Sequence, residues 1–120
     1  MATSPTKRAL AYCKAQGWTA QVVERWNPWA KVRQDLFGFI DLVVLKPGIG
    51  IVGVQVTSDA HVAERVNKIR TTCKDTANEW LRANGVIEVW GWAKRGARGK
   101  RKVWTLRTLP VKAAYREDLA

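Results

Sequence analysis

Asp41 and Gln55 are the two polar residues whose positions suggest chemistry. Asp41 lies inside the apolar segment 39–45, and Gln55 lies inside 52–56. A carboxylate buried in a strand costs several kcal/mol unless it is paired with a cation or binds a metal. The chain has one histidine, His61, and its two cysteines form no CxxC motif, which excludes multi-histidine and thiolate zinc sites. A metal here would therefore be a hard, oxygen-ligated ion, Mg²⁺ or Mn²⁺.

The pairing of two strands decides whether these side chains meet. We expect buried strands at residues 37–45 and 49–57, joined by a turn at Lys46-Pro47-Gly48 into a hairpin. With a loop over residues 46–50, Asp41 faces Gln55. Thr57 and Asp35 then fall on the same face if the extended chain continues to both. A slip of one residue would pair Asp41 with Val54 and remove the cluster.

The remaining pattern predicts the elements that surround this hairpin. Ser4 and Gly17 bound a helix over residues 5–16, and alternation predicts a strand over 18–26, with Trp18, Ala20, Val22, Glu24 and Trp26 on one face. Apolar residues three and four apart predict a long helix over 60–83, followed by strands at 86–93 and 102–109. The order α-β-β-β-α-β-β predicts an α/β (α+β) fold, one domain over residues 1–120 with a mixed central sheet flanked by helices.

The charge balance predicts a polyanionic partner. There are 21 Lys and Arg against 10 Asp and Glu, a formal charge of +11, which favours nucleic acid first and an acidic membrane second. Six basic residues and no acid lie between positions 94 and 102, in the loop that joins the last two strands. We expect nucleic acid to bind at these residues and at a second basic loop: Lys94, Arg95, Arg98, Lys100, Arg101, Lys102, Lys31 and Arg33.

Tryptophans and cysteines carry further expectations. Trp26 and Trp29 flank Pro28 and either stack on bases or pack in the core, whereas the tryptophans at 80, 90, 92 and 104 are expected to pack. Cys13 and Cys73 are expected to be buried free thiols in a reducing cytosol. The first residues lack the apolar core of a signal peptide, and no apolar run is long enough to cross a bilayer. We expect a cytoplasmic protein with no membrane partner.

The hairpin segment resembles the PD-(D/E)XK nuclease superfamily, most closely the small phage, archaeal and bacterial nucleases of the Holliday-junction-resolvase kind. The resemblance lies in Gly38-Phe39-Ile40-Asp41-Leu42-Val43-Val44-Leu45-Lys46 and Gly53-Val54-Gln55-Val56-Thr57-Ser58. It is similar to an Asp-led apolar strand, a turn, and a strand ending Glu-x-Lys-Ser. The resemblance implies a restriction-endonuclease-like αβββαβ core over roughly residues 4–109.

The resemblance also implies a role for each site residue. Asp41 takes the place of the metal-binding aspartate and Gln55 that of the second acidic ligand. Thr57 takes the place of the catalytic lysine, but it carries no positive charge, so Lys46, Lys68 or Lys7 would have to replace that cation. The family carries a further upstream acid, for which Glu24 or Asp35 is available, each close to arginines with which it could instead pair.

The function implied is a metal-dependent DNA endonuclease that hydrolyses phosphodiester bonds in branched DNA, with Mg²⁺ or Mn²⁺, as a homodimer and without a small-molecule cofactor. Two alternatives stay open. One is a nuclease-like fold that binds DNA without cutting it, for which the neutral Gln55 and Thr57 speak. The other is a basic scaffold or RNA-binding protein unrelated to nucleases.

Overall fold

A five-stranded mixed sheet organises the chain, as the computed structural model shows for residues 4–112; residues 1–3 and 113–120, the two ends of the predicted domain, lie outside the described part. The strand order is β1-β4-β5-β6-β7, with β5 and β6 parallel and the other neighbours antiparallel. The strands are β1 (Thr19–Val22), β4 (Leu42–Lys46), β5 (Gly50–Ser58), β6 (Val86–Arg95) and β7 (Val103–Pro110). The predicted mixed sheet flanked by helices is confirmed.

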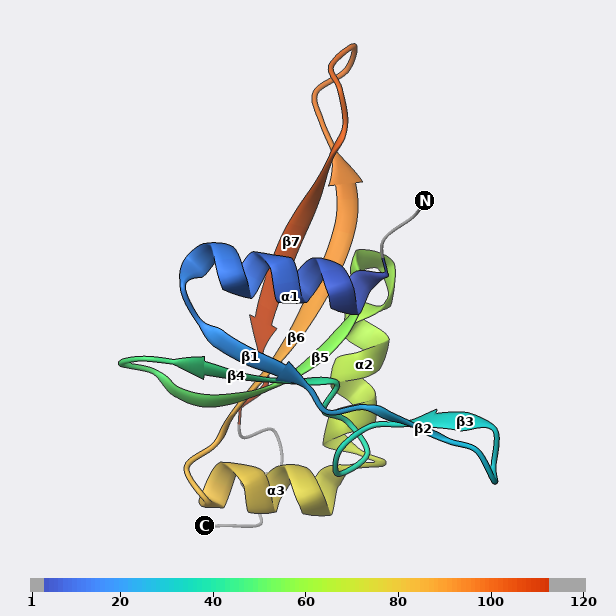
Figure 1. Cartoon of the computed structure of the whole chain (residues 1–120), viewed down its shortest axis with the longest axis vertical. Helices are drawn as coiled ribbons and strands as arrows, with labels where there is room; N and C mark the ends of the chain where they lie inside the picture. Colours follow the sequence, from blue (N-terminus) through green and yellow to red (C-terminus); the bar gives the residue numbers. More distant parts are fainter. Residues whose placement is uncertain (1–3, 113–120) are drawn as a thin grey trace.

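Helices cover both faces of this sheet (Figure 1). Helix α1 (Pro5–Gln16) lies on one face. The short 3-10 helix η1 (Asp59–His61), α2 (Val62–Arg70) and α3 (Lys74–Arg82) lie on the other. Ser4 caps α1 by accepting a hydrogen bond from the Lys7 amide, and Gly17 ends it with φ +79°, as predicted.

Side chains along β5 alternate between the two faces of the sheet, which separates its valines from its polar residues. Val52, Val54 and Val56 point toward α1 and form a core with Trp90. Gly53, Gln55 and Thr57 therefore point toward α2 and α3, where buried apolar residues from the helices and β6 form a second core. The polar residues of β5 thus share the face that α2 and α3 cover.

At Gly91 on β6, the residues that lead into α2 pack directly against the strand. A Cβ at this position would lie 2.3 Å from Val62 Cγ2 and 2.9 Å from the Asp59 Cα. Only glycine leaves room for the helix backbone this close to a strand. The contact fixes the start of α2 against β6.

The predicted strand over residues 18–26 was wrong in its second half. Trp18, Ala20 and Val22 share the α1 face as expected. The chain then leaves the ladder at Glu24, and residues 25–27 form β2 (Arg25–Asn27) in a separate two-stranded sheet with β3 (Val32–Gln34). The expected basic loop around Lys31 and Arg33 is therefore partly a strand.

The predicted strand over residues 37–45 was wrong in its first half. Phe37 and Gly38 both have positive φ, +56° and +88°, and a bridge between Leu36 and Ile40 closes a tight turn. Phe39 and Ile40 are fully buried in the core beneath α2 and α3 rather than in a ladder. The apolar residues Phe39 and Ile40 thus indicate burial, but not pairing in a β-ladder.

The predicted helix over 60–83 is broken at residues 71–73. The Thr71 hydroxyl donates to the Asn67 carbonyl over 2.7 Å, which competes with regular helix continuation. The apolar stripe nevertheless survives the break, because Val62, Ile69, Cys73 and Ala77 all reach the same core. No helix in the described residues 4–112 has the length and apolar character needed to span a bilayer.

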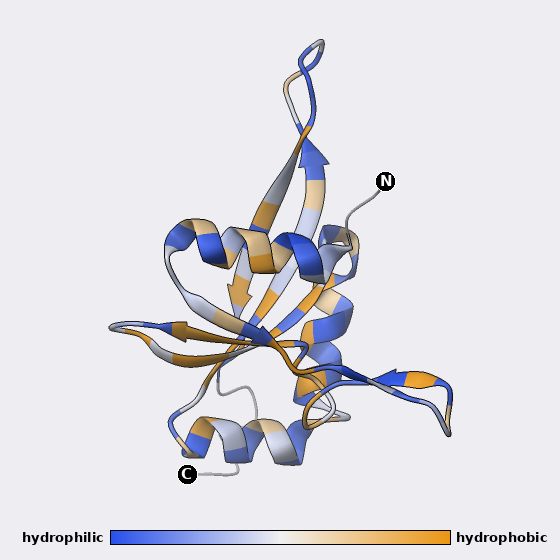
Figure 2. Cartoon of the chain, viewed as in Figure 1, coloured by the Kyte–Doolittle hydropathy of each residue, from blue (hydrophilic) through white to orange (hydrophobic). Residues whose placement is uncertain are grey.

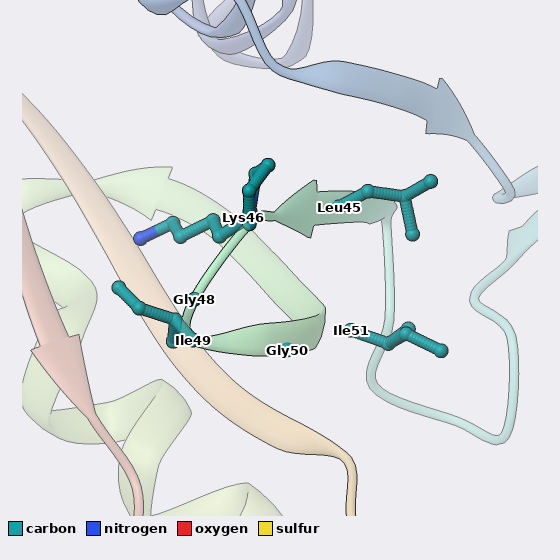
Figure 3. A pocket seen from close by; sticks show the side chains of 7 residues that line it. Leu45, Lys46, Gly48, Ile49, Gly50 and Ile51 are labelled. Atoms are coloured by element: carbon teal, nitrogen blue, oxygen red, sulfur yellow. The ribbon is translucent and has the colours of Figure 1, made fainter.

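Three hairpins extend beyond the helices: β2–β3, β4–β5 and β6–β7 (Figure 1). The loop at the end of β6–β7 is strongly hydrophilic (Figure 2). The β4–β5 turn borders a shallow, open depression lined by residues 45–51. Figure 3 shows Leu45 and Ile51 on one side of this turn and Lys46 extending on the other. The turn lies at the end of the hairpin opposite to Asp41, so this depression is separate from the predicted site.

Candidate active site

Glu24, Asp35 and Asp41 converge at one end of the β4–β5 hairpin. Each offers a carboxylate oxygen, and these oxygens all lie within 4.8 Å of one another. Asp41 directly precedes β4, Glu24 lies between β1 and β2, and Asp35 directly follows β3. The structure thus brings together both acids that the sequence left as alternatives.

Backbone hydrogen bonds hold the three acids together. The amides of Val23 and Glu24 both donate to the Asp41 carbonyl, over 2.9 and 3.4 Å. The tight turn from Leu36 to Ile40 leads the chain from Asp35 to Asp41, and the Thr76 hydroxyl of α3 fixes it by donating to the Phe37 carbonyl over 2.9 Å. The turn that carries Asp35 toward Asp41 is therefore held in place by hydrogen bonds.

The predicted hairpin register is correct and places Gln55 beside Asp41. Leu45 pairs with Ile51 and Val43 with Gly53, as a loop over 46–50 requires. The Gln55 Nε2 donates to Asp41 Oδ2 over 2.9 Å and to Asp35 Oδ2 over 3.4 Å. The Val56 amide donates to the same Asp41 oxygen over 2.8 Å. Asp41 and Gln55 are buried, with 4% and 3% of their surface exposed.

Burial and like charges make Asp41 hard to ionise. Loss of solvation, then a hydrogen bond with Asp35, then repulsion from Asp35 and Glu24 raise the pKa of Asp41 to about 8. The Val56 amide acts in the opposite direction, since it stabilises the carboxylate. A cation bound among the three acids would relieve this repulsion.

The oxygen-rich donor set fits a hard divalent cation. The Gln55 Oε1 supports this fit, because it is buried and has no hydrogen-bond partner. A half-turn of the side-chain amide exchanges Nε2 and Oε1, which would direct the unpartnered oxygen to the carboxylates. Asp41, Glu24, Asp35 and Gln55 could then hold one ion together.

Lys68 is the lysine that the fold brings to the cluster. Its Nζ lies 3.7 Å from Asp35 Oδ2, reaching from α2. Lys46 instead pairs with Glu88 on the α1 side of the sheet, and Lys7 is exposed on α1. Thr57 is buried on the same face as Gln55, two residues further along β5. Of the three candidate lysines, only Lys68 lies beside the acidic cluster.

The predicted nucleic-acid-binding residues fall in two exposed places. Lys31 and Arg33 belong to the β2–β3 hairpin, where Arg33 lies 4.0 Å from the Glu24 carboxylate. Lys94 and Arg95 end β6, and Arg98, Lys100, Arg101 and Lys102 follow in the loop that joins it to β7. Arg95 already pairs with Asp59 over 2.9 Å, and Arg107 pairs with the same carboxylate.

The tryptophans divide between core and surface. Trp90 and Trp92 are buried and Trp80 packs against the core, as expected. Trp104 is 47% exposed, contrary to the expected packing, because it lies on the edge strand β7, where Arg8 stacks on its ring at 3.7 Å. Trp29 and Trp26 do not pack in the core, being 94% and 55% exposed. Cys13 and Cys73 are buried free thiols, as predicted.

Sequence reasoning missed a second buried polar group, on the α1 side. The Lys46 Nζ donates to both oxygens of Glu88, over 3.0 and 3.1 Å, and Trp90 Nε1 donates to Glu88 over 2.7 Å. The Lys46 ammonium also lies over the Trp18 ring. The signal was available, because Glu88 interrupts an apolar strand just as Asp41 does. Every partner in this group is satisfied, which is typical of a structural ion pair.

Comparison with known proteins found no match for this chain among family models, curated proteins or solved structures.

Proposed function

We propose that this protein is a metal-dependent endonuclease that hydrolyses phosphodiester bonds in branched DNA, similar to the PD-(D/E)XK nucleases. The observation that carries the proposal is the cluster of Glu24, Asp35 and Asp41 within 4.8 Å, beside Gln55. The protein has a formal charge of +11, yet these three acids would repel the phosphates of DNA unless a bound cation neutralised them. The seat of that cation is the proposed catalytic centre.

The residues of the cluster divide the work. Asp41, Glu24 and Asp35 would hold Mg²⁺ or Mn²⁺ through carboxylate oxygens, and Gln55 through its amide oxygen. The bound ion would supply Lewis-acid activation of water and neutralise charge at the scissile phosphate. Lys68 supplies a positive charge at the edge of the cluster, where it can contact a phosphate oxygen. Thr57 offers a hydroxyl that can orient water.

Two basic hairpins would bind the DNA backbone. Lys31 and Arg33 extend from the segment that links Glu24 to Asp35. The loop after β6 carries the densest charge, and its six basic residues would follow the phosphates.

A cleavage assay tests the proposal. Branched, duplex and single-stranded DNA are incubated with the protein in EDTA, Mg²⁺ or Mn²⁺, beside Asp41→Asn and Lys68→Met. We expect metal-dependent cleavage that Asp41→Asn abolishes and that Lys68→Met reduces by about 10²-fold or more, the scale on which removing an electrostatic partner of the reacting group lowers a rate. Lys7→Met is the matched control, since Lys7 is exposed on the opposite side of the sheet. Cleavage that survives Asp41→Asn would refute the proposed centre.

A nuclease-like fold that binds DNA without cutting is the second candidate. It is favoured by the Gln55 amide, whose donors already bridge Asp41 and Asp35, and by the neutral Thr57. Binding without cleavage in every metal would select this candidate. Failure to bind any DNA at low salt would refute both and favour a basic scaffold or RNA-binding protein.

The proposal includes two further expectations. A two-fold dimer, which sedimentation would detect, would match the symmetry of a four-way junction. A cytoplasmic location is consistent with the two free, buried thiols, which suit a reducing compartment.

A further inference from the structure

The β2–β3 hairpin, residues 25–34, forms an arm that stands apart from the main sheet (Figure 1). Three residue pairs hold its strands together, from Arg25 with Gln34 to Asn27 with Val32. A hairpin this short is only marginally stable by itself, so its pairing depends on contacts that stabilise its ends and its turn. Both are braced in this molecule.

The turn of the arm holds Trp29 outward. The Asn27 Oδ1 accepts hydrogen bonds from the amides of Trp29 and Ala30, over 2.9 and 3.1 Å. Pro28 restricts the backbone between Asn27 and Trp29, and Lys31 takes a positive φ of 55° to complete the turn. Trp29 is 94% exposed, so this arrangement presents its indole to solvent.

Two indoles and three cations share the arm. Trp26 and Trp29 line one hollow of about 300 Å³ with Arg25, Asn27, Pro28 and Gln34. Arg25, Lys31 and Arg33 are exposed, and the arm contains no acid. Phosphate binding alone would need only the cations. Exposed aromatic rings beside cations are the surface that unpaired nucleobases recognise, by stacking on the rings while the backbone meets the charges.

The arm begins and ends at the acidic cluster. Glu24 directly precedes β2 and Asp35 directly follows β3. A strand rises about 3.3 Å per residue, so the tip lies within roughly 16 Å of the cluster along the arm. That reach corresponds to about five nucleotides at about 3.4 Å per step.

We propose that the arm binds unpaired DNA bases by stacking on Trp29 and Trp26, within about five nucleotides of the phosphate at the cluster. The inference rests on the proposed nuclease function for the identity of the ligand, and it deepens that function. It makes the substrate a DNA in which unpaired or unstacked bases adjoin a duplex, instead of a continuous duplex.

A binding assay in EDTA separates this inference from catalysis. Two labelled DNAs of equal length and charge are compared by fluorescence anisotropy, a continuous duplex and a duplex with a central run of mismatched bases. Wild type, Trp29→Ala, Trp29→Phe and the matched control Val32→Ala are measured. Val32 is 48% exposed on the same arm but carries no ring. Circular dichroism checks the fold of each variant.

We expect wild type to prefer the mismatched DNA, and Trp29→Ala to lose roughly 5- to 150-fold of its affinity for that DNA alone. Trp29→Phe should retain most of the preference, and Val32→Ala all of it. Equal loss on both DNAs, no preference in wild type, or binding of both DNAs that Trp29→Ala leaves unchanged overturns the inference. Preference without cleavage in any metal would refute the nuclease and leave the arm's role standing.

Discussion

The side-chain amide of Gln55 donates to Asp41 over 2.9 Å from the neighbouring strand, with both residues almost fully buried. The same amide reaches Asp35 over 3.4 Å. In the absence of a cation, the Gln55 amide thus bridges the side chains of Asp41 and Asp35.

Gln55→Glu should therefore weaken the metal-free protein and strengthen metal binding. The variant loses the hydrogen bonds that the Gln55 amide donates to Asp41 and Asp35, and it adds a fourth acidic side chain to the cluster, whose repulsion destabilises the fold further. Thermal unfolding in EDTA should show a lower Tm than wild type, and Mg²⁺ should raise the Tm of the variant by more than that of wild type. Gln55→Met is the control, since it removes the amide without adding charge. A Mg²⁺ response equal in Gln55→Glu and Gln55→Met would contradict the assignment of position 55 as a metal ligand.

The raised pKa of Asp41 predicts how stability depends on pH. Asp41 stays protonated in the folded protein up to about 8, whereas in the unfolded chain it ionises near 4. Between these values the folded state binds the extra proton, so its stability falls as pH rises and levels off above about 8. Chemical denaturation of the metal-free protein across this range, compared with Asp41→Asn, measures the effect. The stability advantage of Asp41→Asn should grow with pH; a constant difference would show that Asp41 ionises normally.

The loop after β6 should contribute salt-dependent DNA affinity. Arg98→Ala, Lys100→Ala and Arg101→Ala together should reduce the slope of log K against log salt by up to about 0.9 for each duplex phosphate that the loop no longer neutralises. Affinity should fall alike on every DNA sequence, because binding to phosphates carries no sequence information. A triple variant of Lys14, Arg70 and Arg82, which are exposed on the helices, has the same net charge and serves as control. Equal slopes for the two triple variants would argue against a local role of this loop.

The buried Lys46–Glu88 pair should matter for stability and not for the site. Lys46→Met leaves the Glu88 carboxylate without its cation, at a cost of about 3–5 kcal/mol. Lys46→Met with Glu88→Gln should recover much of that loss, because a neutral amide can still accept from Trp90 Nε1. Urea denaturation of the single and double variants measures the coupling. Additive losses would mean that the two residues act independently.

The sequence allowed the hairpin and its register to be predicted because both follow from local rules. Alternating apolar residues mark β5, and a turn of fixed length places Leu45 opposite Ile51. These two facts align Asp41 with Gln55 without any knowledge of distant parts of the chain. The caps of α1 are equally local.

The convergence of Glu24 and Asp35 depends on tertiary contacts that no local pattern contains. Glu24 reaches the cluster because the chain leaves its ladder to bond the Asp41 carbonyl. Asp35 reaches it because Thr76, far along the chain, secures the turn at Phe37. Lys68 could be chosen over Lys46 and Lys7 only from the packed fold, in which α2 brings its ammonium to 3.7 Å from Asp35.

The close contact at Gly91 fixes one end of α2, so the length of the helix determines where Lys68 lies. Its first turn is fixed against β6 by Val62, and Lys68 stands six residues further along the same helix. Each residue of an α-helix turns the chain by about 100° and advances it by about 1.5 Å. One residue inserted between Val62 and Lys68 would swing the ammonium by more than a quarter of a turn away from Asp35, while leaving every residue of the acidic cluster unchanged. The number of residues between Val62 and Lys68 therefore determines the geometry of the site as strictly as the identity of its acids does.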